Sequence, residues 1–468
     1  MFDPARSPYL QGSYAPVSAE VDGECELVAG EVPRDLDGLL VRNGPNARHE
    51  PRGRYHWFDG DGMLHALRVK GGRVTYKNRW VRTSGLSRED AAGHALWSGI
   101  MEPIRDNPAG IPYKDTANTD VVHHAGALKA LWYLCGPPYK VDPVTLETLG
   151  KDDFAGTFKG KVSAHSKVDP RTGELLFFDY GPIAPYMHFG VADAEGRVVN
   201  HMPIELPGPR LPHDLAFTER FAILMDLPVV FDMDLLAKGR WRTSFDRSLP
   251  ARFAVAPRRG LPTDVRWFEA EPCYIYHSVN AWEEGSEIVM VGCRVAEPFQ
   301  PTRPEEGPWA VMMATLRIQA ALHEWRFDLA TGKTRERALD DANTEFPTMD
   351  RRRLGQRSRY AYNVLIGSEP TVYFDGVAKY DTETGRSERL VFGPGRRGSE
   401  SPFAPRVGAA GEDDGYVMSI VHDEREGRSE LWILDAKDVA RGPVARLRTP
   451  QRVPLGFHAL WIAGHDLA

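Results

Sequence analysis

A run of apolar residues that ends at an aspartate recurs along this chain. A few variable residues and then threonine or glycine usually follow the aspartate, which is typical of a strand running into a tight turn. Asp and Thr side chains bond to local backbone in such turns, and Gly supplies a positive φ. Five stretches have this form, at residues 139–145, 167–173, 326–332, 379–385 and 433–438. The pattern therefore predicts short strands joined by hairpin turns.

The aspartates of these turns recur at a nearly constant interval. Asp328 and Asp381 are 53 residues apart, Asp381 and Asp435 are 54 apart, and Asp142 and Asp193 are 51 apart. A period near fifty with strand pairs inside it is typical of propeller blades, which have about four strands each. A common hairpin turn would explain each stretch alone, but the regular recurrence favours an all-β, seven-bladed β-propeller.

Composition agrees with this fold. The 44 Gly and 36 Pro residues are many for a helical protein, and 10% aromatic residues suit short strands. A chain of 468 residues is too long for one ordinary core, yet no linker or charge block marks a boundary. We expect one propeller domain over residues 1–468, with cap elements inserted between blades, including about 84–110. The stretch from Ser84 to Ile100 is predicted to form a short cap helix.

Charge and hydropathy limit the partners and the location. A net charge of −7 and a pI near 6.1 argue against nucleic acid. We expect no signal peptide in residues 1–10 and no spanning helix, and therefore a cytoplasmic protein. Residues 308–322 are apolar, with Trp309 near the start and Arg317 inside. They are a candidate for peripheral contact with the inner face of the membrane, although a buried strand or a tunnel wall explains them at least as well.

Four histidines in short strand-like phrases are the candidate chemistry, namely His165, His213, His277 and His458. Their separations of 48, 64 and 181 residues are too long for a zinc finger or a helix-borne pair. They converge only if a closed scaffold points them at one axis. An all-histidine set favours a redox or oxygen-handling metal over structural zinc. Each of the 15 His residues, taken alone, is more often an ordinary surface or core residue.

Two motifs lie near the N-terminus, GEVPRDLDGLLVRNGP at residues 30–45 and HWFDGDGM at residues 56–63. Together with the four histidine phrases, in this order, they resemble the carotenoid cleavage oxygenase family, whose members include carotenoid-, apocarotenoid- and stilbene-cleaving enzymes. The resemblance covers nearly the whole chain. It implies a seven-bladed propeller with a helical cap and Fe(II) on its axis, bound by the four histidines. It also implies oxidative cleavage of a conjugated C=C bond by O₂ to two carbonyl products.

The resemblance further implies three glutamates that hold the second ring nitrogens of ligating histidines. Two have matches here, Glu345 before Phe-Pro and Glu400 before Ser-Pro-Phe. The third is missing, because residues 130–139 read ALWYLCGPPY and place Tyr133 or Leu134 at its position. We hypothesise that the Tyr133 hydroxyl, a backbone carbonyl or a water accepts the proton of His213, the usual partner of that glutamate.

The same stretch bears on the substrate. Stilbene-cleaving members bind a phenol hydroxyl with a lysine just before the missing glutamate and with a tyrosine of the cap. This chain has Trp132 or Tyr133 at the first place, and no tyrosine is evident near residues 100–102. The sequence therefore favours an apolar polyene such as an apocarotenoid, or a phenylpropene bound differently, over a stilbene. Thr119 matches a position where the family places a small side chain near an open iron site.

Two other function classes compete with this interpretation. A propeller hydrolase would hold an axial Ca²⁺, which prefers oxygen ligands, so the all-histidine set argues against it. A non-catalytic propeller that binds a hydrophobic ligand or a partner protein through a degraded metal site stays open, supported by the missing glutamate. Isomerase activity, known in vertebrate relatives, also stays open within the iron class.

Overall fold

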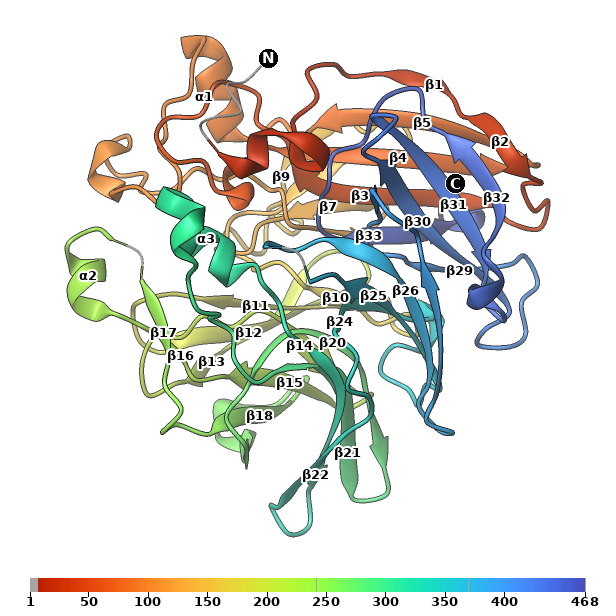
Figure 1. Cartoon of the computed structure of the whole chain (residues 1–468). Coiled ribbons are helices and arrows are strands. Elements are labelled where there is room, and N and C mark those ends of the chain that lie inside the picture. Colours follow the sequence, from red (N-terminus) through yellow and green to blue (C-terminus); the bar gives the residue numbers. More distant parts are fainter. Residues whose placement is uncertain (1–6, 241, 369, 468) are drawn as a thin grey trace.

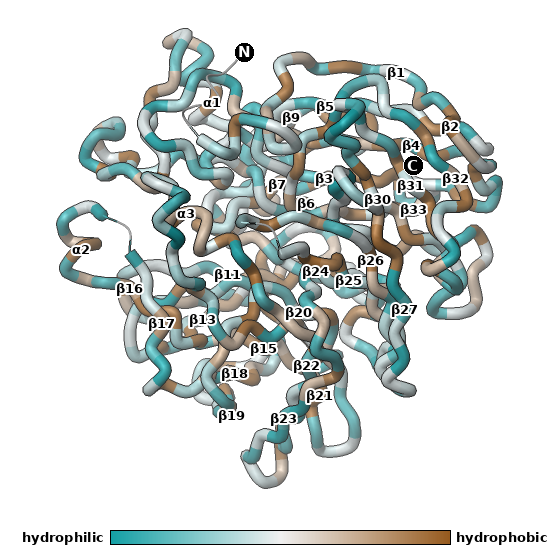
Figure 2. The backbone as a smooth tube through the Cα atoms, viewed as in Figure 1, coloured by the Kyte–Doolittle hydropathy of each residue, from teal (hydrophilic) through white to brown (hydrophobic). Residues whose placement is uncertain are grey.

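The computed structural model describes residues 7–240, 242–368 and 370–467, and most of its regular structure is β-sheet (Figure 1). Within this part of the chain, seven antiparallel sheets of four or more strands follow one another as blades of a propeller, as the spacing of the turns predicts. In Figure 2 hydrophobic positions are concentrated in the strands, for example in β30 (Gly415–Asp423), which is buried over nearly its whole length.

Five blades are built from strands that are consecutive within their own segment. They are β6 (Asp120–His124), β7 (Ala127–Leu131), β8 (Tyr139–Val141) and β9 (Thr148–Lys151); β10 (Lys167–Val168), β11 (Leu175–Tyr180), β12 (Tyr186–Ala192) and β13 (Val198–Glu205); β14 (Leu215–Phe217), β15 (Phe221–Asp226), β18 (Ala251–Pro257) and β19 (Arg266–Ala270); β20 (Tyr274–Glu284), β21 (Glu287–Val295), β22 (Ala321–Asp328) and β23 (Thr334–Ala338); and β24 (Thr344–Thr348), β25 (Tyr360–Ile366), β26 (Phe374–Asp381) and β27 (Arg386–Val391). A hairpin of β16 (Val229–Phe231) and β17 (Thr243–Phe245), with α2 (Met233–Ala237) between them, interrupts the third of these blades.

The other two blades join strands from the two ends of the chain, which closes the ring. One contains β28 (Arg396–Arg397), β29 (Phe403–Pro405), β30, β31 (Arg428–Asp435), β32 (Pro443–Arg448) and β2 (Glu26–Gly30). The other contains β33 (Ala459–Ala463), β3 (Gly38–Pro45), β4 (Gly62–Lys70), β5 (Arg73–Trp80) and β1 (Asp22–Glu24). In the second of these blades β33 pairs with β3, so that Ala459 lies opposite Arg42.

The predicted turns have the expected chemistry. The Asp142 carboxylate accepts the backbone N–H groups of Val144 and Thr145 at 2.9 and 2.7 Å, between β8 and β9. Asp328 does the same for Ala330 and Thr331 between β22 and β23. These local bonds satisfy the backbone where the sheet ladder stops, and so they fix the length of each hairpin.

The cap helix is shorter than the sequence suggested. Helix α1 (Ser84–Ala92) begins after Thr83, whose side chain accepts the N–H of Leu86 at 3.1 Å. It ends at Gly93, whose φ of 74° is left-handed and stops the helix, so the predicted continuation to Ile100 is wrong. Among the described residues, no helix is long and apolar enough to cross a membrane.

The apolar stretch at 308–322 forms neither one strand nor one helix. It contains the end of a 3₁₀ helix (Pro304–Trp309), helix α3 (Ala310–Thr315), a short loop and the first residues of β22. Met312 is buried, whereas Val311 is 58% exposed. Leu316 and Ile318 line an apolar cavity at the centre of the protein. Part of this stretch is therefore a cavity wall, one of the alternatives that its composition left open.

Candidate metal centre

The first strands of the blades meet around the axis of the propeller. Contacts join β33 to β6, β6 to β10, β14 to β20, β20 to β24 and β29 to β33. Residues at the start of these strands, or just before them, therefore face one another although they are far apart in sequence. All four predicted histidines occupy such places.

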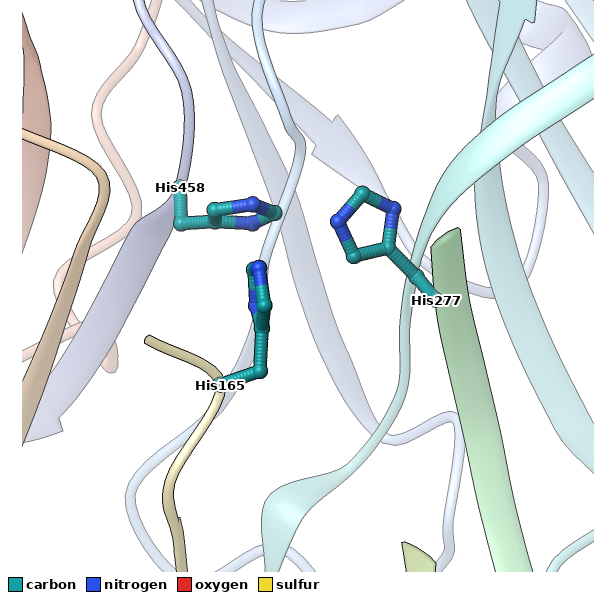
Figure 3. A group of neighbouring side chains, drawn as sticks. All are labelled: His165, His277 and His458. Carbon is teal, nitrogen blue, oxygen red and sulfur yellow. The ribbon is translucent and has the colours of Figure 1, made fainter. Parts of the chain in front are cut away.

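The imidazole rings of the four histidines form one cluster. The ring centroid of His165 lies 4.6 Å from that of His458, 4.6 Å from that of His213 and 4.9 Å from that of His277. One possible ligand atom from each of His165, His277 and His458 lies within 4.8 Å of the other two. Figure 3 shows these three rings directed at a common space. His213 is close to this group, with its ring centroid 5.1 Å from that of His277.

Local backbone features aim these side chains. His277 lies within β20 at a bulge, where the register with β21 shifts between Ile275 and Ser278, and a bulge re-aims a side chain out of the regular alternation. His165 lies in the loop before β10 with a left-handed φ of 62°. His458 directly precedes β33. None of these features is visible in a repeat pattern.

Two buried glutamates lie behind the rings, as the resemblance implied. Glu345, on β24, places its Oε2 2.5 Å from Nδ1 of His277 and also accepts the N–H of Phe346. Glu400 places its Oε1 3.0 Å from Nδ1 of His458 and also accepts the N–H of Ala459. Each glutamate thus accepts one hydrogen bond from the ring of a histidine and one from a backbone N–H.

Burial shifts the ionisation of this cluster. It lowers the pKa of His165, His213 and His277 well below the ordinary value, and the neighbouring imidazoles add to the effect. These three rings are therefore neutral, which is the form that binds a metal. Burial raises the pKa of Glu345 to about 8. For His458, burial lowers the pKa, but Glu400 outweighs it and the net shift is upward.

The cluster fits a metal ion. The Nε2 atoms of His165 and His277 are buried and have no hydrogen-bond partner within the part of the chain that the structure describes. A buried polar atom without a partner costs about 1–3 kcal/mol, so two of them aimed into one space fit a common ligand between them. Imidazole nitrogen suits Fe, Zn, Cu or Ni. The donor set does not fit Ca²⁺, which takes oxygen.

His213 is held differently from the other three rings. No hydrogen bond to its ring is present among the described residues, and Tyr276 packs edge-on against it with ring centroids 5.1 Å apart. Tyr133 lines the same cavity but forms no hydrogen bond with His213, so the tyrosine hydroxyl, one of the three acceptors considered for this ring, is not its partner. The Tyr133 ring instead packs against Phe58, with centroids 5.1 Å apart.

Asp214, next to His213, forms hydrogen bonds with residues that lie close to His165 and His277 in the sequence. Its Oδ1 accepts a hydrogen bond from Nζ of Lys167 at 2.6 Å. Its Oδ2 accepts the backbone N–H of Ser278 at 2.7 Å and the hydroxyl of Ser278 at 2.6 Å. Asp214 therefore fixes the backbone near His165, His213 and His277 relative to one another. Asp214 was not predicted from the sequence, although its position directly after the candidate ligand His213 was a signal for it.

Two cavities of opposite character meet at the histidines, and His277 and His458 line both of them. One cavity is almost entirely apolar, and its walls include Trp57, Phe58, Tyr276, Phe346 and Phe457. The other is polar, with Asp120, Lys167, Asp214 and Arg351 among its lining residues.

Thr119 lines the apolar cavity beside His458. Its hydroxyl accepts the N–H of Tyr133 at 3.2 Å and donates to the Asn118 side chain at 3.1 Å. Its carbonyl accepts the N–H of His458 at 3.4 Å. The side chain is thus small, held in place and close to the cluster.

A second group of possible metal ligands lies on the outside of one blade. His188 and His201 each bond to one oxygen of Asp179, at 3.1 and 3.0 Å. Their rings are stacked, 4.9 Å apart with planes only 19° from parallel. Nearly parallel ring planes do not meet at one nearby ion, so this group is a hydrogen-bonded surface triad rather than a metal site.

Comparisons with known proteins agree with this geometry. Residues 14–463 match the family model described as retinal pigment epithelial membrane protein. The chain is 34% identical to carotenoid 9,10(9′,10′)-cleavage dioxygenase 1 of Phaseolus vulgaris, over 98% of this chain and 90% of the relative. The chain belongs to the carotenoid cleavage oxygenase family. It is therefore an oxygenase of the class that breaks C=C bonds oxidatively, which confirms the prediction at family level.

Other members of the carotenoid cleavage oxygenase family are nearly as similar. Isoeugenol monooxygenase of Pseudomonas nitroreducens is 31% identical over 97% of this chain and 98% of its own. The crystal structure of Pseudomonas brassicacearum lignostilbene dioxygenase superposes with a TM-score of 0.89 at 28% identity, covering 98% of both chains. Cobalt-substituted Synechocystis apocarotenoid oxygenase gives 0.86 at 27% identity, covering 99% of both.

Proposed function

We propose that this protein binds one Fe(II) through His165, His213, His277 and His458. With O₂, it cleaves a conjugated C=C bond into two carbonyl compounds. The observation that carries the proposal is the pair of buried, unpartnered Nε2 atoms of His165 and His277, aimed at a space that all four rings surround. Bound Fe(II) would supply O₂ binding and activation there, because four imidazoles leave two positions of an octahedral ion open.

The chain's own groups prepare this centre. Glu345 and Glu400 accept the Nδ1–H of His277 and His458, which leaves the Nε2 lone pair of each ring free for the metal. Burial keeps three of the rings neutral at physiological pH. The protein therefore does not need to deprotonate these rings before the metal binds.

The apolar cavity determines what reaches the centre. Its aromatic walls, including Phe58, Tyr276 and Phe346, suit a flat conjugated molecule and exclude water from the reacting double bond. Holding the alkene beside the metal converts a bimolecular encounter into a positioned one. Leu316 and Ile318, from the apolar stretch at 308–322, belong to this wall.

We infer that the substrate is an apocarotenoid or a phenylpropene. The cavity is lined mainly by apolar side chains, and Tyr133 and Tyr276 are the tyrosines among its lining residues. Related proteins carry names that refer to both kinds of substrate, the Synechocystis apocarotenoid oxygenase and the isoeugenol monooxygenase. Thr119 is proposed to keep an open coordination position accessible, because its side chain is small and lies beside His458.

Loading and turnover can be tested in one experiment. The chelated protein is titrated with Fe(II) without oxygen and then mixed with ¹⁸O₂ and a panel of an apocarotenal, a long carotenoid, a hydroxystilbene and a 4-hydroxyphenylpropene. We expect about one iron per chain and one ¹⁸O in each aldehyde product from an apocarotenal or a phenylpropene. Iron binding without product from any panel member contradicts the substrate assignment. No iron binding contradicts the proposal and favours the non-catalytic binding protein.

A further inference from the structure

We propose that Asp120 is a positioning residue for His165 and supplies a third carboxylate to the metal centre. The inference rests on the proposed function, because it takes the histidine cluster as a metal site. Asp120 was not predicted from the sequence, and it lies at a different position from the missing third glutamate, which falls at Tyr133 or Leu134.

The carboxylate of Asp120 contacts both its own strand and His165. It is the first residue of β6, and its Oδ1 accepts the N–H of Val121 at 2.7 Å. Its Oδ2 accepts the backbone N–H of His165 at 3.1 Å and lies 3.6 Å from Nδ1 of the same residue. The Asp120 side chain is 14% exposed and lines the polar cavity. One carboxylate oxygen therefore faces both the backbone and the ring of a single histidine.

The two glutamates also lie behind ligand rings, but each forms a direct hydrogen bond with Nδ1. Glu345 forms a hydrogen bond with Nδ1 of His277, and it also accepts the N–H of Phe346, the residue that follows the glutamate itself. Glu400 faces Nδ1 of His458 and accepts the next backbone N–H, that of Ala459. Asp120 faces Nδ1 of His165 and accepts a backbone N–H of the same segment. Three histidines thus share one pattern, a carboxylate behind the ring and a nitrogen directed at the common space.

The backbone of His165 explains why its N–H is bound. A φ of 62° is left-handed, a backbone conformation that residues other than Gly rarely adopt. The surroundings must hold such a residue in place, and the hydrogen bond that the His165 N–H donates to Asp120 does so. Without it, the ring would be free to leave the cluster, because His165 lies in a loop rather than in a strand.

The blades show why Asp120 completes the set. His165, His213, His277 and His458 lie on or just before β10, β14, β20 and β33. Glu345 lies on β24, and Glu400 lies shortly before β29. The blade that remains is the one formed by β6–β9, and Asp120 begins its first strand. Each of the seven described blades therefore contributes one proposed ligand or one carboxylate that lies behind a ligand ring.

The distance defines how Asp120 acts on the ring. At 3.6 Å the contact is longer than a direct hydrogen bond, so the carboxylate acts on Nδ1 through its charge while its hydrogen bond goes to the backbone. A negative charge behind a ligating imidazole makes it a better donor to a cation. Removing the charge while keeping the shape should therefore weaken metal binding without unfolding the protein.

The test compares Asp120→Asn with Asp142→Asn in the full chain, using Co(II) as the probe. Asp142 is a matched control, because its carboxylate also accepts backbone N–H groups in the same blade but lies in an outer turn. Co(II) affinity and the visible absorption of the bound ion are measured, together with the melting temperature of the metal-free protein. We expect Asp120→Asn to weaken Co(II) binding about 10- to 100-fold and to shift the absorption, and Asp142→Asn to match the parent.

The possible results either support or overturn the role of Asp120. Parent-like Co(II) binding by Asp120→Asn overturns the proposal, and a parent that binds no Co(II) contradicts the proposed function instead. If Asp120→Asn does not fold, Asp120→Glu serves as the second variant, because it restores the charge. Co(II) binding by Asp120→Glu that remains within a few-fold of the parent supports the proposal. A hundredfold loss in Asp120→Glu, when the metal-free protein melts like the parent, overturns it.

Discussion

The carboxylate of Glu345 lies 2.5 Å from Nδ1 of His277, on the side of the ring away from the shared centre. Burial raises the pKa of Glu345 to about 8, and burial lowers the pKa of His277. Near neutral pH the metal-free pair therefore has little net charge. A cation at Nε2 of His277 would favour the ionised glutamate, so this pair links the metal to the protein behind it.

Replacing Glu345 by Gln should weaken the metal site without destroying it. Gln keeps the shape and one acceptor oxygen but cannot become negative, so we expect Fe(II) affinity to fall about 10- to 100-fold. Glu336→Gln is the matched control, because Glu336 bonds to His323 at 3.2 Å on the outside of a blade. Both are measured by competition with a chelator. Equal Fe(II) affinity in the two variants would contradict the role of Glu345.

Metal binding should stabilise the fold measurably. Ligands that bind only the native state add about 2.7 kcal/mol at 100 times Kd, so we expect a higher melting temperature with Fe(II) under nitrogen than with a chelator. His277→Asn should abolish that difference. His201→Asn should preserve it, because His201 lies in the surface triad. A metal-dependent shift that survives in His277→Asn would contradict the assigned ligand set.

Tyr133 should not be needed to retain iron. Its hydroxyl makes no hydrogen bond with His213, so we expect Tyr133→Phe to bind the same amount of Fe(II) as the parent. Substrate affinity is the property that we expect to change, because Tyr133 lines the apolar cavity. Iron is measured by elemental analysis after gel filtration. A loss of iron in Tyr133→Phe would contradict this expectation and would indicate that the Tyr133 hydroxyl does bond to His213.

Acid should destabilise the fold through His56. Burial lowers its pKa to about 3, against about 6.5 in an unfolded chain, so the unfolded state binds the proton first as the pH falls. The stability that depends on neutral His56 is therefore complete above pH 6.5 and is lost below it. At pH 5 this one group should cost roughly 2 kcal/mol of unfolding free energy.

His56→Asn tests this assignment by urea unfolding at pH 7.5 and pH 5. Asn can still accept the N–H of Phe58, as Nδ1 of His56 does at 3.0 Å, but it does not titrate. We expect the variant to be less stable at both values, because the ring also contacts Phe58. The loss between the two pH values should be smaller than in the parent. An unchanged difference would assign the acid sensitivity to other buried histidines.

Much of the fold followed from the sequence because turn chemistry is local. Asp142, Asp193, Asp328 and Asp381 each lie at the turn between the third and fourth strands of a four-stranded blade, and the described part of the chain forms seven blades. The four histidines, Glu345 and Glu400 were found through motifs, and the structure brings them together. Asp120 and Asp214 were not found, because a role that depends on convergence at the axis leaves no pattern in neighbouring residues.

The errors have equally local causes. The cap helix ends at Gly93 rather than near Ile100, because a left-handed glycine stops it. The Tyr133 hydroxyl, one of three acceptors considered for His213, does not bond to this ring for another reason. Residue spacing placed Tyr133 beside the cluster, but which way its ring turns is decided by packing against Phe58, which lies far away in the sequence.

The pairing of β33 with β3 has a consequence for how the protein is made. His458 directly precedes β33, and β33 needs the N-terminal strand β3 as its partner. A ribosome has therefore produced the first three histidines, and all three carboxylates, well before the fourth ring arrives. A chain that stops before residue 459 lacks β33, the strand whose pairing with β3 closes the ring of blades. The cluster of four rings thus forms only after β33 has been made, so a metal ion held by all four rings, as proposed, would be bound after the seven blades have been synthesised.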